Sequence, residues 1–302
     1  NAPPLSPCPT VVTIHDISFE HYPQFFSPRD LLILKTLVPL SARRAAHILT
    51  VSQHARREIV DRYGLPPDKI TVTYEAAGEQ FQPVTDPASM EAARAKYGIP
   101  DGPFVLALGN LQPRKNIARL VAAFGQIAGY EQPPNHPVPP GRFPVNHSPN
   151  QPSLVIAGKA QWRESEVYQA VQQAGLAGRV VFPGYVDDAD LPALYSAAAV
   201  FVYPSLYEGF GLPPLEAMAC GAPVISSNAA SLPEVVGDAA LLVNPTDTEA
   251  LAQALADVLA QPELAADLRA RGLRRAAGFS WERCAAETLA VYAEVLAARR
   301  GQ

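Results

Sequence analysis

The chain has 302 residues, of which 48% are hydrophobic and 18% charged, a composition that suits one large or two ordinary globular domains. Its formal net charge is −5, from 24 basic and 29 acidic residues, so global electrostatics give no reason to expect a nucleic acid or an anionic membrane as partner. No apolar run approaches the roughly 18 residues needed to span a bilayer, and the first residues lack a secretory signal pattern.

The cysteines indicate a reducing compartment. Cys8, Cys220 and Cys284 are far apart in the chain and lack the spacing of metal ligands. We therefore expect reduced, structural thiols in a cytoplasmic protein.

The first part of the chain predicts an incomplete doubly wound sheet. Short β-branched and apolar runs predict strands, and amphipathic stretches predict the helices between them. The expected elements are strands at 10–14, 47–51 and 70–74, with helices at 31–46 and between residues 52 and 64. This β-α-β-α-β order predicts a partial Rossmann-like domain at residues 1–84.

A second and more regular α/β series follows a hinge-like segment rich in proline and glycine. Its expected strands lie at 104–109, 154–158, 180–182, 200–203, 223–226 and 240–243, separated by helices. This predicts a complete Rossmann-like domain at residues 85–280, interrupted by a proline-rich insertion at 131–153. A final helix at 281–298, with Ser280 as its N-cap, is expected to pack back on the first domain.

The segment 200–222 has the strongest signal in the chain. A buried strand at 200–203 leads into a glycine-bearing loop, and Pro213 and Pro214 open a helix expected at 215–220. Backbone N–H groups at the start of such a helix favour an anion. Two glutamates, Glu208 and Glu216, flank this position and would repel an anion unless they face hydroxyl groups. Phosphate and hydroxyls together indicate a nucleotide sugar.

Several residues around the glycine loop are candidates for this ligand. The main-chain N–H groups of Phe210, Gly211 and Leu212 are free to bind it, and Gly209 and Gly211 are expected to let the backbone approach it closely. A glycosidase acid/base pair is the other interpretation of the two glutamates. A glycosidase, however, has no use for the phosphate site, so we favour the nucleotide sugar.

Two cations lie at the end of another predicted strand. Arg114 and Lys115 follow the strand at 104–109 and precede a helix at Ile117. An arginine fork and a lysine point charge at this place form a clamp for a diphosphate. An exposed basic turn is the alternative, and the nearby glutamate loop favours the clamp.

His15 occupies a similar position in the first domain. It follows the strand at 10–14, and ligands of open α/β sheets bind beyond the carboxyl ends of strands. Position alone fits a catalytic histidine and a turn-capping histidine equally well.

Five motifs together carry a family resemblance. They are GNLQPRKN at 109–116, GYV at 184–186, the two glutamates of E-x7-E at 208–216, SLPEVVG at 231–237 and FSW at 279–281. The chain resembles the retaining glycosyltransferases of family 4, the group 1 glycosyltransferases, and is mannosyltransferase-like. The resemblance implies an α/β fold of the GT-B type, with two facing Rossmann-like domains and the acceptor on the side of the first.

The resemblance also implies roles for individual residues. Glu208 would bind hydroxyls of the donor sugar, Glu216 the ribose, and His15 would face the transferred sugar. The implied catalytic residues are His15, Lys115 and Glu208. The implied donor-binding residues are Asn110, Arg114, Lys115, Tyr185, Val186, Glu208, Gly209, Phe210, Gly211, Leu212 and Glu216. At the position of Asn110 many relatives have an arginine.

The expected reaction moves a hexose, with mannose preferred, from a GDP- or UDP-linked donor to a glycan or lipid-linked acceptor. Retention of the anomeric configuration is implied, in a cytoplasmic polysaccharide pathway at the inner face of the membrane, with peripheral membrane association. No Asp-x-Asp motif stands at a strand end, so neither a metal nor another cofactor is expected.

The resemblance leaves two other functions open. Relatives place further β/α units before the point where this sequence starts, so a truncated, inactive nucleotide-sugar-binding protein is one alternative. A nucleotide-sugar epimerase of the same fold is the other. The incomplete first domain would expose edge strands, for which a second copy or a partner chain is the expected cover.

Overall fold

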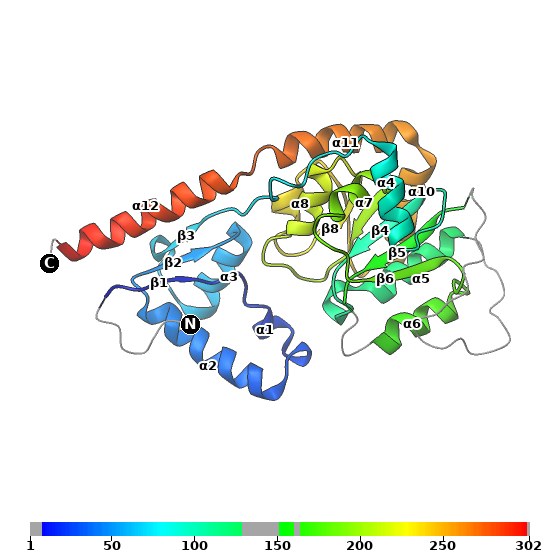
Figure 1. Cartoon of the computed structure of the whole chain (residues 1–302). Coiled ribbons are helices and arrows are strands. Elements are labelled where there is room, and N and C mark those ends of the chain that lie inside the picture. The colour runs from blue at the N-terminus through cyan, green and yellow to red at the C-terminus, as the bar shows by residue number, and fades with distance from the viewer. Residues whose placement is uncertain (1–7, 129–150, 160–163, 301–302) are drawn as a thin grey trace.

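The computed structural model describes residues 8–128, 151–159 and 164–300, and these form two parallel sheets (Figure 1). The small sheet has the order β1-β2-β3, with β1 at Val11–Thr13, β2 at His47–Thr50 and β3 at Ile70–Val72. The large sheet has the order β6-β5-β4-β7-β8-β9. Its strands are β4 (Phe104–Leu108), β5 (Ser153–Ala157), β6 (Val180–Gly184), β7 (Val200–Tyr203), β8 (Val224–Ser227) and β9 (Leu241–Val243). The predicted α/β class with doubly wound parallel sheets is confirmed.

Helices connect the strands in both parts. Those of the first part are α1 (Ser18–His21), α2 (Pro28–Arg44) and α3 (Gln53–Tyr63). Those of the second are α4 (Pro87–Lys96), α5 (Ile117–Ala128), α6 (Glu164–Gln173), α7 (Leu191–Ala197), α8 (Leu212–Ala219), α9 (Leu232–Val236), α10 (Thr248–Ala260) and α11 (Pro262–Ala276). Within the described residues, no helix combines the length and the apolar character needed to cross a membrane.

Helix α8 begins earlier than the sequence pattern suggested. It starts at Leu212, three residues before the expected start at Leu215. Pro213 and Pro214 lie within its first turn, where the missing N–H groups cost nothing and the fixed φ suits a helix. Gly221 follows the helix with φ +75°, a left-handed conformation that glycine adopts readily at a helix end.

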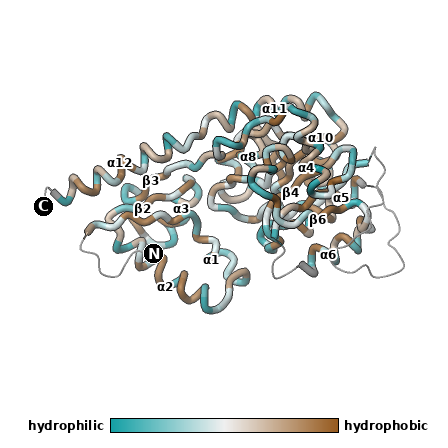
Figure 2. The backbone as a smooth tube through the Cα atoms, viewed as in Figure 1, coloured by the Kyte–Doolittle hydropathy of each residue, from teal (hydrophilic) through white to brown (hydrophobic). Residues whose placement is uncertain are grey.

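The core of the large domain lies on both faces of its sheet. Successive residues of β4 point to opposite sides: Phe104 and Leu106 join one buried cluster, Val105 and Ala107 the other. Helices α7 and α8 cover the first face, and α5 and α10 the second. Hydrophobic residues accordingly concentrate in the middle of this domain (Figure 2). Strands buried on both faces are the reason why these segments read as continuous apolar runs.

The last helix returns to the small sheet. Helix α12 (Trp281–Arg300) leaves the large domain after α11 and packs against β2 (Figure 1). Ser280 caps its first turn, since its Oγ accepts a hydrogen bond from the Arg283 N–H (3.1 Å). Val291 supplies a buried side chain of this helix. The expected proline-rich insertion at 131–153 lies outside the described residues as far as residue 150, and Ser153 already belongs to β5.

Candidate active site

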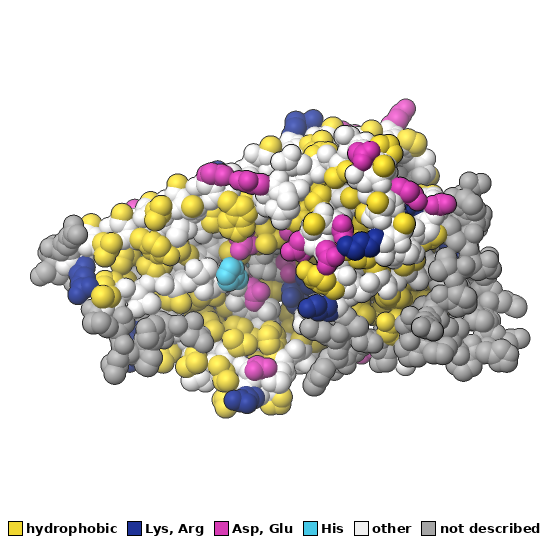
Figure 3. All heavy atoms as spheres, viewed as in Figure 1, with side chains coloured by type: hydrophobic (Ala, Val, Ile, Leu, Met, Phe, Trp, Pro, Cys, Tyr) yellow, Lys and Arg dark blue, Asp and Glu magenta, His cyan; other side chains and the backbone are white. Residues whose placement is uncertain are grey.

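The site is built where the carboxyl ends of strands from both sheets face each other. Strand β7 is buried throughout, and residues 206–211 follow it at this edge. We call these residues the glycine loop. Strand β4 delivers the turn that carries Arg114 and Lys115, and β1 delivers His15 from the other sheet. Charged side chains of both signs gather between the two halves of the molecule on the face shown in Figure 3.

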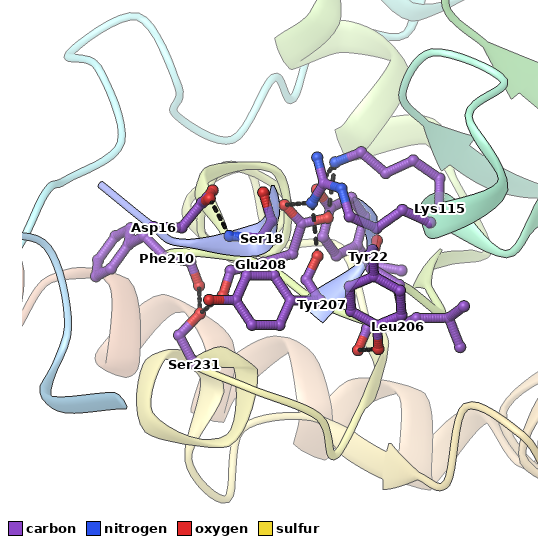
Figure 4. Close-up of polar contacts among 12 residues, drawn as sticks. Asp16, Ser18, Tyr22, Lys115, Leu206, Tyr207, Glu208, Phe210 and Ser231 are labelled. Carbon is purple, nitrogen blue, oxygen red and sulfur yellow. Dashed lines mark hydrogen bonds and ion pairs between the residues drawn. The ribbon is translucent and has the colours of Figure 1, made fainter. Parts of the chain in front are cut away.

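Glu208 is held by both cations of the clamp. Its Oε1 lies 2.7 Å from Lys115 Nζ and its Oε2 lies 2.9 Å from Arg114 Nη1. Lys115 Nζ also lies 2.5 Å from the hydroxyl oxygen of Tyr203, at the end of β7. Figure 4 shows Lys115 and Glu208 pointing toward one another from two different loops. The carboxylate thus offsets one of the two positive charges of Lys115 and Arg114.

Burial and the neighbouring opposite charges shift the pKa values of Glu208 and Lys115 in opposite directions. Burial alone would raise the pKa of the Glu208 carboxyl, but the charges of Lys115 and Arg114 outweigh it and the pKa is lowered. Burial lowers the pKa of the Lys115 ammonium, and Glu208 only partly restores it. Glu208 is therefore ionised at neutral pH, and its charge is balanced by side chains that would otherwise be free to bind an anion.

The clamp turn is tied to the end of β7. Arg114 donates a second hydrogen bond to the Tyr207 carbonyl oxygen (2.6 Å). The turn Pro113–Lys115 ends at Asn116, whose φ of +59° is a conformation that asparagine tolerates better than most residues. The Asn116 side chain donates to the carbonyl oxygens of Pro204 (3.0 Å) and Pro245 (2.7 Å). These bonds fix the cations relative to the glycine loop before any ligand arrives.

Glu216 has a different environment from Glu208. It lies on α8 and accepts a hydrogen bond from the Tyr195 hydroxyl (3.1 Å). Burial raises the pKa of its carboxyl to about 7, with a further contribution from the charge of Asp188, while the Tyr195 hydrogen bond acts against it. The two glutamates of E-x7-E therefore differ in charge, one ionised and one close to half protonated at neutral pH.

His15 faces the clamp from the first domain. Its side chain is 65% exposed, and Nδ1 lies 3.4 Å from Glu75 Oε1. The hydrogen bond to Glu75 raises the pKa of the imidazole, against the effect of burial. Glu75 was not predicted from the sequence, although it directly follows the strand expected at 70–74 and so occupies the same kind of strand-end position as His15.

A cavity of about 250 Å³ at the site is lined by residues of both domains. From the first domain it is lined by His15, Asp16 and Glu75; from the second, by Lys115, Glu208 and the backbone that starts α8. A larger cavity of about 620 Å³ lies on the first-domain side, shares His15 and Asp16 with the smaller one, and is also lined by Arg114. Four of the expected donor-binding residues of the loop line the smaller cavity: Gly209, Phe210, Gly211 and Leu212.

The remaining expected donor-binding residues lie outside the lining of this cavity. Val186 is 3% exposed and packs in the core of the large domain. Tyr185 is 55% exposed, with Lys159 Nζ 5.1 Å from its ring centroid. The Oδ1 atom of Asn110 is buried and accepts no hydrogen bond within the described structure. A buried acceptor without a donor is the kind of atom that a ligand hydroxyl or amide can satisfy.

Contacts within the protein require both glycines of the loop, and the expected close approach of a ligand to their backbone stays a prediction. A Cβ atom on Gly209 would lie 2.6 Å from the His15 carbonyl oxygen, in the other domain. Gly211 has φ +121°, and a Cβ there would lie 2.6 Å from a methyl carbon of Leu232. The glycines thus let the two domains and α9 approach the loop.

The Gly209→Ala substitution is expected to destabilise the protein by about 1–3 kcal/mol, because its Cβ would push the loop and the His15 backbone apart. Denaturant unfolding measures this change. Gly98→Ala is the matched comparison, since Gly98 has φ +63° but no atom within 4 Å of its added Cβ. It is expected to cost only about 1 kcal/mol from backbone strain. Equal effects of the two substitutions would show that the domain contact at Gly209 is not tight.

The fold and the site together define a class. Two facing Rossmann-like domains, with a cation clamp and two glutamates at the strand ends of the second, are the arrangement of GT-B glycosyltransferases. Residues 89–275 match the family model described as glycosyl transferases group 1, and residues 2–76 match the model described as Glycosyltransferase Family 4. The chain belongs to the group 1 glycosyltransferases of family 4, as its motifs predicted.

Individual relatives agree with this assignment. O-antigen chain mannosyltransferase B of Escherichia coli is 37% identical over 282 residues, which cover 93% of this chain and 69% of that protein. The serotype-specific mannosyltransferase WbdA of Escherichia coli is 34% identical over 79% of this chain, but only 27% of WbdA is covered. The chain therefore spans about two thirds of the first relative and about a quarter of the second.

Solved structures show the same architecture. Sucrose-phosphate synthase from Thermosynechococcus elongatus superposes with a TM-score of 0.75 at 29% identity, covering 95% of this chain and 68% of that one. HepE from Anabaena, solved in complex with UDP-glucose, has a TM-score of 0.75 at 23% identity and covers 94% and 72% of the two chains. These likenesses confirm the GT-B fold.

Proposed function

We propose that the chain is a retaining mannosyltransferase, which moves mannose from a nucleoside diphosphate donor, GDP-mannose, to a hydroxyl of a growing polysaccharide. The relatives support the sugar, because both are named as mannosyltransferases. The first also supports the acceptor class, because it is named for an O-antigen chain. The observation that carries the proposal is the 250 Å³ cavity, which sets His15 and Glu75 of one domain against Lys115 and Glu208 of the other.

The proposed mechanism begins with an exchange of partners at the clamp. The donor diphosphate competes with Glu208 for Lys115 and Arg114, and the displaced carboxylate accepts hydrogen bonds from hydroxyls of the sugar. The two cations then neutralise the charge that develops on the leaving diphosphate, which is the step where electrostatic stabilisation contributes most. At the start of α8, the N–H groups of Gly211 and Leu212 can face the same anion, since Pro213 and Pro214 have none. Neither a metal nor a cofactor is part of this proposal.

His15 is proposed to act from the acceptor side. The hydrogen bond to Glu75 holds the imidazole in one orientation and favours its protonated form, which can donate a hydrogen bond to an oxygen of the transferred sugar. We propose attack by the acceptor hydroxyl from the face on which the diphosphate leaves, so that the departing phosphate takes the proton and the anomeric configuration is retained. We further propose that the glycan or lipid-linked acceptor is met at the cytoplasmic face of a membrane.

The experiment is a transfer assay with purified protein. GDP-mannose, UDP-glucose and UDP-galactose are supplied in turn with a short mannan acceptor, with and without EDTA, and the linkage is read by NMR. Mannose transfer to give an α-linked product, unaffected by EDTA, is the expected result. Nucleotide binding by calorimetry without turnover would instead identify a binding protein, and conversion of the donor sugar without an acceptor would identify an epimerase.

Glu216 is expected to make donor binding depend on pH. Its carboxyl has a pKa of about 7 in the free protein, and ribose hydroxyls donate hydrogen bonds to the ionised form, so binding favours loss of the proton. Affinity for GDP should therefore be constant above pH 7 and fall below it, by up to about tenfold for each pH unit. Calorimetry from pH 5.5 to 8.5 measures this. Glu216→Gln should weaken binding and abolish the pH dependence; an unchanged profile would place the titration elsewhere.

A further inference from the structure

The first domain contacts Tyr207, near the start of the glycine loop. The Tyr207 ring packs against three first-domain rings: His21, Tyr22 and His54, with centroids 5.5, 5.9 and 6.0 Å away. Its hydroxyl donates a hydrogen bond to Glu58, on α3. The side chain of the residue just before Glu208 thus makes these ring contacts and this hydrogen bond with the other domain.

Glu234 holds the same interface on the other side of the loop. Its Oε1 accepts hydrogen bonds from the Gln53 N–H (2.7 Å) and the Tyr74 hydroxyl (2.6 Å), and its Oε2 accepts one from the His54 N–H (3.0 Å). Gln53 and His54 begin α3, where N–H groups lack partners within the helix. A carboxylate of the second domain therefore caps a helix of the first, and all three of these donors come from that domain.

Two serines extend this contact to the loop itself. Ser52 Oγ donates to the Gly209 carbonyl oxygen (2.8 Å) and accepts from the Ala55 N–H (3.0 Å), so it is both the cap of α3 and a link between domains. Ser231 Oγ lies 2.9 Å from the Glu208 carbonyl oxygen and 2.7 Å from that of Phe210 (Figure 4). Ser231 immediately precedes α9, the short helix that carries Glu234.

The backbone of α9 is held rigidly from behind. Arg275, on α11, donates to the carbonyl oxygens of Glu234 (2.6 Å) and Val235 (2.8 Å). Any movement of the first domain away from Glu234 would therefore break the three hydrogen bonds to the carboxylate rather than drag α9 along. The carboxylate also has a favourable charge for the position, because the N-terminus of α3 carries a partial positive charge.

We propose that Glu234 is a positioning residue for glycosyl transfer: by capping α3 it closes the two domains and sets His15 opposite Glu208. Glu234 is not among the residues that line the 250 Å³ cavity, so it acts on the reaction through the domain arrangement. The kinetic part of this inference rests on the proposed function, whereas the structural part stands without it.

Glu234→Gln tests the proposal with little change in size. The amide keeps one acceptor oxygen but loses the charge, and its NH₂ group cannot accept from an N–H. The expected results are a kcat lower by about 100-fold, because the reacting groups are misplaced, with Kd for GDP unchanged. Exchange of the Gln53 and His54 amide hydrogens should become about tenfold faster. Small-angle scattering should show a larger radius of gyration.

Two further variants make the outcome decisive. Tyr74→Phe removes one of the three donors and should have the same effects in weaker form. Glu263→Gln, at the exposed first turn of α11, is the matched control and should change nothing. The proposal is wrong if Glu234→Gln leaves kcat or the amide exchange unaltered, or if it also weakens GDP binding and speeds exchange throughout the second domain. If the wild type transfers no sugar, the proposed function fails, while exchange and scattering still decide the role of Glu234.

Discussion

Lys115→Met is expected to lower kcat/KM for sugar transfer by about 10²–10³-fold, the cost of removing one preorganised charge from a developing anion. Lys115 Nζ lies 2.7 Å from Glu208 in the free protein and is proposed to transfer this contact to the leaving diphosphate. Methionine preserves most of the side-chain volume and none of the charge. Steady-state kinetics with GDP-mannose measure the effect, and calorimetry should show weaker GDP binding in parallel.

Stability provides an internal check on the Lys115 substitution. Glu208 would keep only Arg114 as a cationic partner, and breaking a buried ion pair costs about 3–5 kcal/mol at most. Lys35→Met, on the exposed surface of α2, is the control and should change neither quantity. If the folded Lys115→Met protein keeps a kcat/KM for transfer within a few-fold of the wild type, Lys115 does not act on the diphosphate as proposed.

Glu208→Gln is expected to separate transfer from nucleotide binding. Transfer should fall by about 10²–10³-fold, because an amide cannot replace the carboxylate that receives the sugar hydroxyls. GDP alone should bind more tightly to the Glu208→Gln variant than to the wild type. In the wild type the ionised Glu208 competes with the diphosphate for Lys115 and Arg114. Calorimetry with GDP and a transfer assay on the same preparation measure both effects.

The opposite result would change the role assigned to Glu208. If Glu208→Gln weakens GDP binding, the carboxylate is needed to hold the two cations in place for the phosphate and does not compete with it. Glu216→Gln provides the contrast, since it is expected to weaken GDP binding through the ribose. Together the two variants test whether the glutamates of E-x7-E have separate tasks.

Local sequence patterns were sufficient for most of the second domain. Its strands are buried on both faces and read as continuous apolar runs, as at Val200–Tyr203. Residues that follow strand ends, such as Lys115 and His15, were identified because parallel strands bring their carboxyl ends to one edge. The start of α8 was missed by three residues, because prolines suit the first turn of a helix as well as the loop before it.

The sequence by itself determined the α/β class and the family, because these depend on short-range periodicity and on motifs of a few residues; the clamp residues it gave as a prediction. Only the tertiary structure decided which groups meet. It paired Glu208 with both cations, placed Glu75 behind His15, and set Glu234 on the first turn of α3, about 180 residues away in the chain. Such contacts depend on how two separately folded domains dock, and no local pattern specifies the partner of a side chain across an interface.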